Sequence, residues 1–236
     1  MISRTLYAWI FAWIFAWLCF GSSYVHAQYK MHFFCPDFPP YTTVDSTGSH
    51  SGIGLDKMKS ILDSVGVDYT IEINSNHGRA LAELKTGRSD GFFMASQNYE
   101  RDKYAVFSES VMTNRWVWIV LTSHHGEFSS FPKSGYTVAS LLNTNTNRWL
   151  TKTGFNLAHP AESITSLISM LDKQEVNAVL VAEEVYNHRF KNDPKYKVIL
   201  QEEKEFGVYI SKSFLNRHPQ FMEKFNKAIQ ASQTKR

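Results

Sequence analysis

Residues 54–94 read GLDKMKSILDSVGVDYTIEINSNHGRALAELKTGRSDGFFM, and the order of patterns within this stretch predicts an α/β fold. Apolar residues recur at helical spacing over residues 54–65, so we expect a helix there. Residues 69–73 alternate as a strand, and residues 79–84 form a short helical pattern. The apolar run 91–94 is typical of a strand that is buried on both faces.

The same alternation extends in both directions along the chain. Residues 31–35 read as a strand, which completes a β-α-β-α-β order and implies a parallel sheet with helices on its faces. A second cycle of expected strands and helices follows: strands 116–121, 136–139, 178–181, 198–200 and 208–210, and helices beginning at residues 147, 163, 183 and 221. Because no Pro/Gly/Ser-rich linker separates the two cycles, we expect strands to join them directly, as a hinge.

Composition excludes several classes of protein. Of the 236 residues, 43% are hydrophobic and 20% are charged, which builds a packed core and argues against disorder. The net charge of +3 is too small for a nucleic-acid-binding face. Two cysteines exclude a disulfide scaffold and a multi-cysteine zinc site. The adjacent His124 and His125 have no third ligand nearby, so we expect no metal and no cofactor.

The first 27 residues read as a cleaved signal peptide. Arg4 supplies a positive charge, residues 6–20 form an uncharged apolar run, and Val25-His26-Ala27 favours cleavage before Gln28. The alternative is a membrane anchor, which needs about 20 apolar residues, more than this run provides.

Lipid attachment at Cys19 is disfavoured, because the bulky Trp17 and Leu18 precede it. We therefore expect a soluble protein of the periplasm. Its remaining cysteine, Cys35, ends a buried strand and is expected to be packed.

Five short motifs occur in a fixed order between residues 33 and 108: Phe38-Pro39-Pro40-Tyr41, Gly52-Ile53-Gly54-Leu55-Asp56, the stretch from Arg79 to Asp90, Glu100-Arg101, and Phe107-Ser108. Their order resembles the family 3 extracellular solute-binding proteins, the polar amino acid-type receptors of ABC importers. The second half is similar more loosely, through Asn177-Ala178-Val179-Leu180 and Gly207-Val208-Tyr209-Ile210-Ser211.

This resemblance implies an α/β fold of the second periplasmic-binding-protein type, with two β/α lobes joined by a two-strand hinge. Lobe 1 would hold residues 28–114 plus 206–236, and lobe 2 would hold residues 115–205. The ligand would lie in the cleft between the lobes.

Segments that leave strands at their carboxyl ends are where open α/β sheets bind ligands. The first such segment carries Phe38 and Tyr41 around two stiffening prolines. Either ring would stack on a ligand, or both would pack locally.

The second segment carries Met94, Ser96 and Arg101. The resemblance implies that Arg101 grips a ligand carboxylate, assisted by the backbone of Met94 and the hydroxyl of Ser96. A guanidinium offers two parallel donors that match a carboxylate. The alternative is an ordinary ion pair of Arg101 with Asp102 or Glu109.

Lobe 2 would contribute Thr144 and Asn145, from a polar turn that contains no glycine where the family has a Gly-Thr pair. The alternative is a plain capping loop. Amino acid receptors of this family often place an aspartate two residues past Leu180, and Ala182 stands there instead. Glu183 would take the place of this aspartate, or it would only place a negative charge in the first turn of a helix.

Two further features have open interpretations. Arg79 follows His77 at a strand-to-helix junction, where it would face the cleft or remain a solvated first-turn residue. Trp116 and Trp118 share one face of a strand and would pack in the core or hinge, with cleft lining as the alternative.

The resemblance predicts a monomeric periplasmic receptor of an ABC importer that closes around a small, carboxylate-bearing, amino acid-like solute and docks on a membrane permease. We expect no enzymatic activity. The alternatives are a cyclohexadienyl dehydratase-like enzyme, with Glu183 or Glu184 as general acid, and a ligand-sensing module without a transport role. The replacement of the aspartate by Ala182 raises the alternative of a ligand other than an amino acid.

Overall fold

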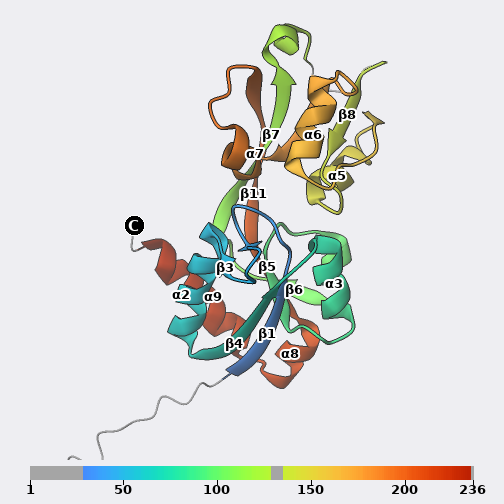
Figure 1. Cartoon of the computed structure of the whole chain (residues 1–236). Coiled ribbons are helices and arrows are strands. Elements are labelled where there is room, and N and C mark those ends of the chain that lie inside the picture. The colour runs from blue at the N-terminus through green and yellow to red at the C-terminus, as the bar shows by residue number, and fades with distance from the viewer. Residues whose placement is uncertain (1–28, 129–134, 235–236) are drawn as a thin grey trace, which may run out of the picture.

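The computed structural model describes residues 29–128 and 135–234, which form two lobes stacked end to end (Figure 1). The expected signal peptide, its cleavage before Gln28 and the question of lipid on Cys19 lie outside these residues. Within the described residues, no helix combines the length and apolarity needed to cross a bilayer.

The sheet of lobe 1 is centred on β1 (Tyr29–Cys35), which pairs in parallel with β4 (Val67–Ile73) and with β5 (Gly91–Ala95). The predicted parallel β-α-β-α-β order is therefore confirmed. On the other side of β5 runs the end of β11 (Tyr196–Ser211), antiparallel, and β6 (Ala105–Phe107) also pairs with β11.

Amphipathic helices cover the sheet of lobe 1. One of the predicted helices, α2 (Ile53–Val65), buries Leu55, Met58 and Ile61 and ends where Gly66 adopts a left-handed φ of 74°. This conformation suits glycine because glycine has no Cβ. The helices of lobe 1 are α2 (Ile53–Val65), α3 (His77–Lys85), α4 (Tyr99–Asp102), α8 (Lys212–Arg217) and α9 (Phe221–Thr234).

Lobe 2 repeats the scheme on a smaller sheet with the strand order β7-β10-β8-β9. Ser163 caps α6 (Ile164–Asp172) as predicted, because its Oγ accepts the backbone N–H of Ser166 at 3.1 Å. The strands are β7 (Met112–Leu121), β8 (Thr137–Ser140), β9 (Asn156–Leu157) and β10 (Ala178–Ala182), and the helices are η1 (Thr122–Glu127), α5 (Asn145–Leu150), α6 (Ile164–Asp172) and α7 (Glu183–Phe190).

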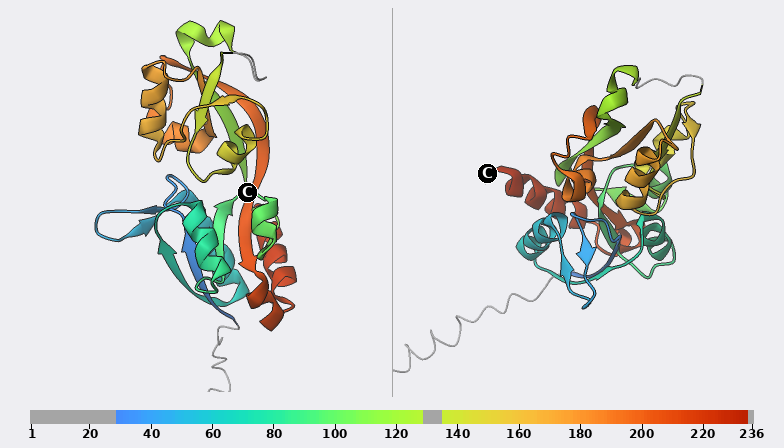
Figure 2. Two further views of the ribbon diagram at one scale, coloured as in Figure 1. Left: turned by 90° about the vertical axis from the view of Figure 1, so that its right-hand side faces the viewer. Right: turned by 45° about the horizontal axis from the view of Figure 1, so that its top comes forward.

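The hinge consists of β7 and β11, which run side by side between the lobes, and β11 continues into lobe 1, as the left view of Figure 2 shows. Their antiparallel register extends from Met112 opposite Phe206 to Leu121 opposite Tyr196. Both stretches predicted as strands, 198–200 and 208–210, are strand in the structure, but they belong to the single strand β11 and are not separate elements. Between them lies the polar stretch 201–205, which pairs with β7 between the lobes without burying an apolar face.

Four short strands were not predicted from the sequence, because strands of two or three residues carry no periodic pattern. They are β6, β9 and the hairpin formed by β2 (Thr43–Val44) and β3 (His50–Ser51).

Candidate functional site

A cavity lies between the lobes, where the loops after β1, β4 and β5 face the loops after β8 and β10. These are the carboxyl ends of parallel strands, as expected. Its volume of about 30 Å³ holds one or two water molecules. Lobe 1 and the hinge contribute Phe38, His77, Ser96, Arg101, Asn114, Trp116 and Phe206, and lobe 2 contributes Leu141, Thr144, Asn145, Thr146, Val181 and Ala182.

Arg101 brings a positive charge into this cavity while being only 3% exposed. Its Nη1 donates to the carbonyl oxygen of Ser96 at 2.7 Å, and the rings of Phe92 and Tyr209 lie 5.5 and 5.9 Å from its guanidinium carbon. Asn98 caps the short helix α4 that carries it, by accepting the N–H of Arg101 at 3.0 Å. The position of Arg101 is thus fixed by backbone and ring contacts.

The guanidinium of Arg101 takes part in none of the ion pairs found among the described residues. Asp102, its suggested partner, instead accepts a hydrogen bond from the hydroxyl of Tyr209 at 2.9 Å. Burial lowers the pKa of Arg101 to about 10, which still leaves it charged at neutral pH. A buried cation without a carboxylate is favourably placed to bind an anion.

Two buried polar atoms beside Arg101 also lack a partner within the described part of the chain. They are the hydroxyl of Ser96 and the side-chain oxygen Oδ1 of Asn114. Because buried polar groups are normally hydrogen-bonded, these two atoms mark positions where a bound molecule would supply the missing bonds.

His77 forms the floor of the cavity on the side of lobe 1. Its Nε2 lies 3.0 Å from the carbonyl oxygen of Met94, and Phe38 packs edge-on against its ring with the centroids 4.9 Å apart. Burial, and secondarily the charge of Arg101, lower the pKa of His77 to about 3. The ring is therefore neutral at pH 7, and because a carbonyl only accepts, Nε2 carries the proton that is donated to Met94.

Asparagines of lobe 2 reach across to lobe 1. Asn145 donates Nδ2 to the carbonyl of Ser96 at 3.0 Å, and its Oδ1 accepts from Asn98 at 2.6 Å. Asn143 donates to Oδ1 of Asn76 at 3.2 Å. These bonds hold the lobes together directly over the cavity.

The lobe 2 turn achieves this approach without a glycine. Asn143 adopts a left-handed φ of 60°, a conformation that asparagine tolerates better than most residues. Thr144 then caps α5, because its hydroxyl accepts the N–H of Asn147 at 3.3 Å and donates to the carbonyl of Leu141 at 2.6 Å. Thr144 thus both lines the cavity and fixes the turn.

Five of the residues singled out from the sequence line the cavity: Phe38, Ser96, Arg101, Thr144 and Asn145. Tyr41 lies behind Phe38 instead, 1% exposed, with its ring 4.9 Å from that of Phe206. The side chain of Met94 is fully buried against Gly54, although its backbone, at a positive φ of 56°, positions His77.

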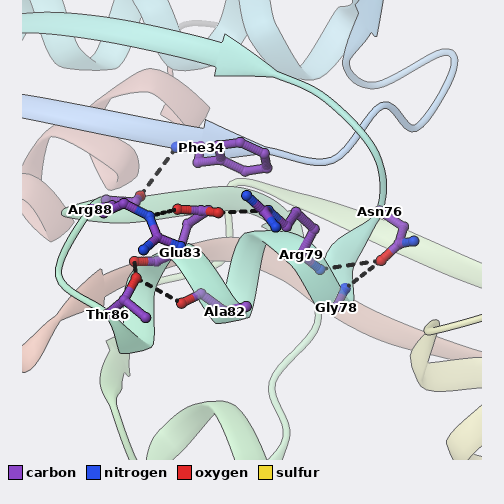
Figure 3. A network of polar contacts seen from close by, with 9 residues as sticks. Phe34, Asn76, Gly78, Arg79, Ala82, Glu83, Thr86 and Arg88 are labelled. Carbon is purple, nitrogen blue, oxygen red and sulfur yellow. Dashed lines mark hydrogen bonds and ion pairs between the residues drawn. The ribbon is translucent and has the colours of Figure 1, made fainter.

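Glu183 and Arg79 are engaged elsewhere. Glu183 Oε2 pairs with Nη1 of Arg115 at 2.8 Å on the outside of the hinge strand. Figure 3 shows Arg79 extended along α3 toward Glu83, which lies between Arg79 and Arg88, and Arg79 Nε is 2.6 Å from Glu83 Oε1. Neither residue lines the cavity.

Sequence reasoning did not place Asn114, Phe206 or His77 in the site. It expected Trp116 in the core or hinge, with cleft lining as the alternative, and the structure bears out that alternative. Trp116 is 4% exposed and lines the cavity, whereas Trp118 is fully buried and donates Nε1 to Gln201 at 2.6 Å. Because Asn114 precedes Trp116 by two residues on the same strand, the period of two would have indicated a shared face.

A family model describing bacterial extracellular solute-binding proteins, family 3, matches residues 32–236. The chain belongs to this family. A search of curated proteins finds no match.

Solved structures share the fold at low sequence identity. An ancestral amino acid-binding protein described as a precursor of cyclohexadienyl dehydratase has a TM-score of 0.71 at 18% identity, over 87% of this chain and 90% of that one. A histidine kinase sensor domain with similarity to periplasmic binding proteins also reaches 0.71, at 14% identity over 87% and 91%. An ABC uptake transporter substrate-binding protein from Streptococcus pneumoniae with bound histidine reaches 0.68, at 17% identity over 86% of each chain.

Proposed function

We propose that this protein is a periplasmic receptor that captures a small, carboxylate-bearing, amino acid-like solute between its lobes and delivers it, as a monomer, to the membrane permease of an ABC importer. Arg101 carries this proposal. It is a buried guanidinium in the cavity, held by a carbonyl and two rings and not by a carboxylate. Ligand oxygens would complete its hydrogen bonding, together with the free hydroxyl of Ser96.

A ligand ammonium would be held by a neutral acceptor in this protein. Ala182 lines the cavity where relatives place an aspartate, and no acidic side chain is found among the described residues lining it. Oδ1 of Asn114 is a buried acceptor without a partner, so it is suited to take a hydrogen bond from an ammonium. A hydrogen bond from an ammonium to an amide is weaker than one to a carboxylate, so the ammonium contributes less to the affinity. Ligands without an ammonium would therefore also bind.

Hinge bending would admit the ligand. A cavity of about 30 Å³ is too small for an amino acid, so the lobes must separate before binding. We place the boundaries between lobes at residues 114/115 and 205/206, because Asn114 lies opposite Lys204 and Thr113 opposite Glu205 in the hinge ladder. A ligand that touches both lobes stabilises the closed state over the open one.

The same observations argue against a dehydratase. A general acid must contact the substrate, and its pKa must be raised by burial. Glu183 is paired with Arg115 and Glu184 is exposed, and neither lines the cavity. A sensing module would use the same binding step, so the two roles differ only in the membrane partner.

A thermal-shift screen of amino acids and small carboxylates tests the proposal. A ligand at 100 times its Kd adds about 2.7 kcal/mol to the free energy of unfolding. Arg101→Gln should remove the shift, whereas Arg79→Gln, on a neighbouring helix outside the cavity, should keep it. A full shift in Arg101→Gln, or turnover of prephenate or arogenate by the wild type, would refute the proposal.

A further inference from the structure

A second hollow adjoins the cavity, and we call it the outer groove. It has a volume of about 400 Å³, and its walls include Asn98, Tyr99, Trp116, Arg148, Trp149 and Lys152. Trp116 and Asn145 line both spaces, so the outer groove begins where the inner cavity ends. A ligand held at Arg101 would therefore extend past Trp116 into this groove.

The outer groove is electropositive. Arg148 lies in the last turn of α5, and Lys152 lies two residues past the end of this helix. Neither side chain takes part in an ion pair found among the described residues. The acidic residue of the groove, Glu100, is already paired with Lys103 at 2.7 Å. The charge of Arg148 also helps to lower the pKa of Glu100, but neither Arg148 nor Lys152 forms an ion pair with Glu100 in the described part of the chain, so both can contact an anion that enters the groove.

Arg148 is also electrostatically linked to the inner site. Its charge contributes to lowering the pKa of Arg101, after the larger effect of burial. The positive charges of the two guanidinium groups repel each other. An acidic group beside each guanidinium offsets this repulsion. Charge complementarity therefore favours a ligand with an acidic group at either end.

Aromatic rings flank the path between the two charges. Trp116 lines the junction, with Nζ of Lys204 5.5 Å above its ring. Tyr99 is 74% exposed at the rim, and the ring of Trp149 is braced by those of Trp118 and Phe155, each 6.4 Å away. Such walls provide apolar contact for the carbon chain that would connect two acidic ends.

We propose that the physiological ligand is an elongated molecule with two acidic groups, one bound at Arg101 and the other in the outer groove at Arg148 and Lys152. This inference rests on the proposed function for the first acidic group and adds the second. It distinguishes the protein from a receptor for neutral amino acids, whose ligand would end at Trp116.

Isothermal titration calorimetry with two matched series tests the inference. The probes are unbranched α,ω-dicarboxylates of four to eight carbons and monocarboxylates of the same lengths. We expect the wild type to bind the dicarboxylate of fitting length at least tenfold more tightly than its monocarboxylate counterpart, with one molecule per chain. Arg148→Gln should reduce this ratio to near one, and Lys152→Gln should reduce it partly. The matched control is Arg189→Gln, on the exposed face of α7, which should keep the ratio.

The outcomes separate the two proposals. Equal affinity for both series in the wild type, a ratio unchanged by Arg148→Gln, or two dicarboxylates bound per chain would overturn the inference and leave the proposed receptor function standing. Failure of every carboxylate and amino acid to bind the wild type would instead overturn the proposed function, and the inference with it. Circular dichroism of each variant confirms that a loss of binding is not a loss of fold.

Discussion

The carbonyl oxygen of Ser96 accepts a hydrogen bond from Asn145 of lobe 2 at 3.0 Å. The same oxygen accepts Nη1 of Arg101 at 2.7 Å. One backbone atom therefore receives both the guanidinium that we assign to ligand binding and the amide that closes the cleft. A ligand that binds Arg101, as we propose, would therefore also act on the contact that Asn145 makes between the lobes.

Loss of the Asn145 side chain should favour the open state. Asn145→Ala removes the bonds to Ser96 and Asn98, each worth about 1 kcal/mol. We expect a larger radius of gyration in small-angle scattering without ligand. Part of the free energy of ligand binding must then drive the closure of the lobes, so the affinity for the ligand should fall about tenfold.

Asn147→Ala is the matched control for this variant, since Asn147 lies on the same helix and its side chain makes none of the cross-lobe bonds. Scattering curves that coincide for the two variants would show that the asparagine contacts do not hold the cleft closed.

Asn114→Leu tests the acceptor for a ligand ammonium. The substitution keeps a similar volume and removes Oδ1, which is buried and unpartnered. Calorimetry with the best-binding amino acid and its des-amino analogue should show about a tenfold loss for the amino acid alone. Equal losses for both compounds would mean that Asn114 has no contact with the ammonium.

Ala182→Asp should act in the opposite direction. It places a carboxylate on the cavity wall, at the position where the family resemblance led us to expect an aspartate. We expect the ratio of affinities, amino acid over des-amino analogue, to rise, because an ammonium pairs more strongly with a carboxylate than with an amide. A falling ratio would place Ala182 away from the amino end of the ligand.

His77 should make the protein less stable in acid. Its pKa is about 3 in the folded protein and near 6.5 when exposed, so between these values the unfolded chain binds a proton that the folded chain does not. The free energy of unfolding then falls on acidification, by about 1.4 kcal/mol per pH unit from this group.

Urea denaturation of wild type and His77→Gln between pH 7 and pH 4 measures this contribution. Glutamine retains a donor for the carbonyl of Met94 and does not titrate, so its stability should fall less steeply with decreasing pH. Parallel curves for the two proteins would show that His77 is solvated in the folded state.

Arg79→Gln should affect stability and not binding. Arg79 pairs with Glu83, whose pKa is held below its usual range by the hydrogen bond from Arg88 and by both arginine charges. We expect a small decrease in melting temperature above pH 5, which disappears as Glu83 is protonated. A changed ligand affinity would place Arg79 at the cleft.

The two β/α cycles were predictable from local patterns, because apolar residues at periods of two and 3.6 report which face of a strand or helix is buried. The helix over 54–65 and the buried strand at 91–94 are confirmed within one residue of their ends. Stretch 201–205 was not recognised as a strand, because it is ordered by its partner β7 and not by burial of its own side chains. Hydrogen bonding between segments that are distant along the chain produces no periodic pattern of apolar residues in the sequence.

Some residues of the candidate site could likewise be predicted from the sequence, and others could not. Residues that follow strands, such as Ser96 and Asn145, were predicted for the cleft from chain order together with the family resemblance, because parallel strands bring their carboxyl ends to one edge. Chain order also brings Glu183 and Arg79 near that edge, but only the folded molecule directs their charges to Arg115 and Glu83 instead. Which way a side chain points depends on what packs beside it, and that neighbour is distant in the sequence.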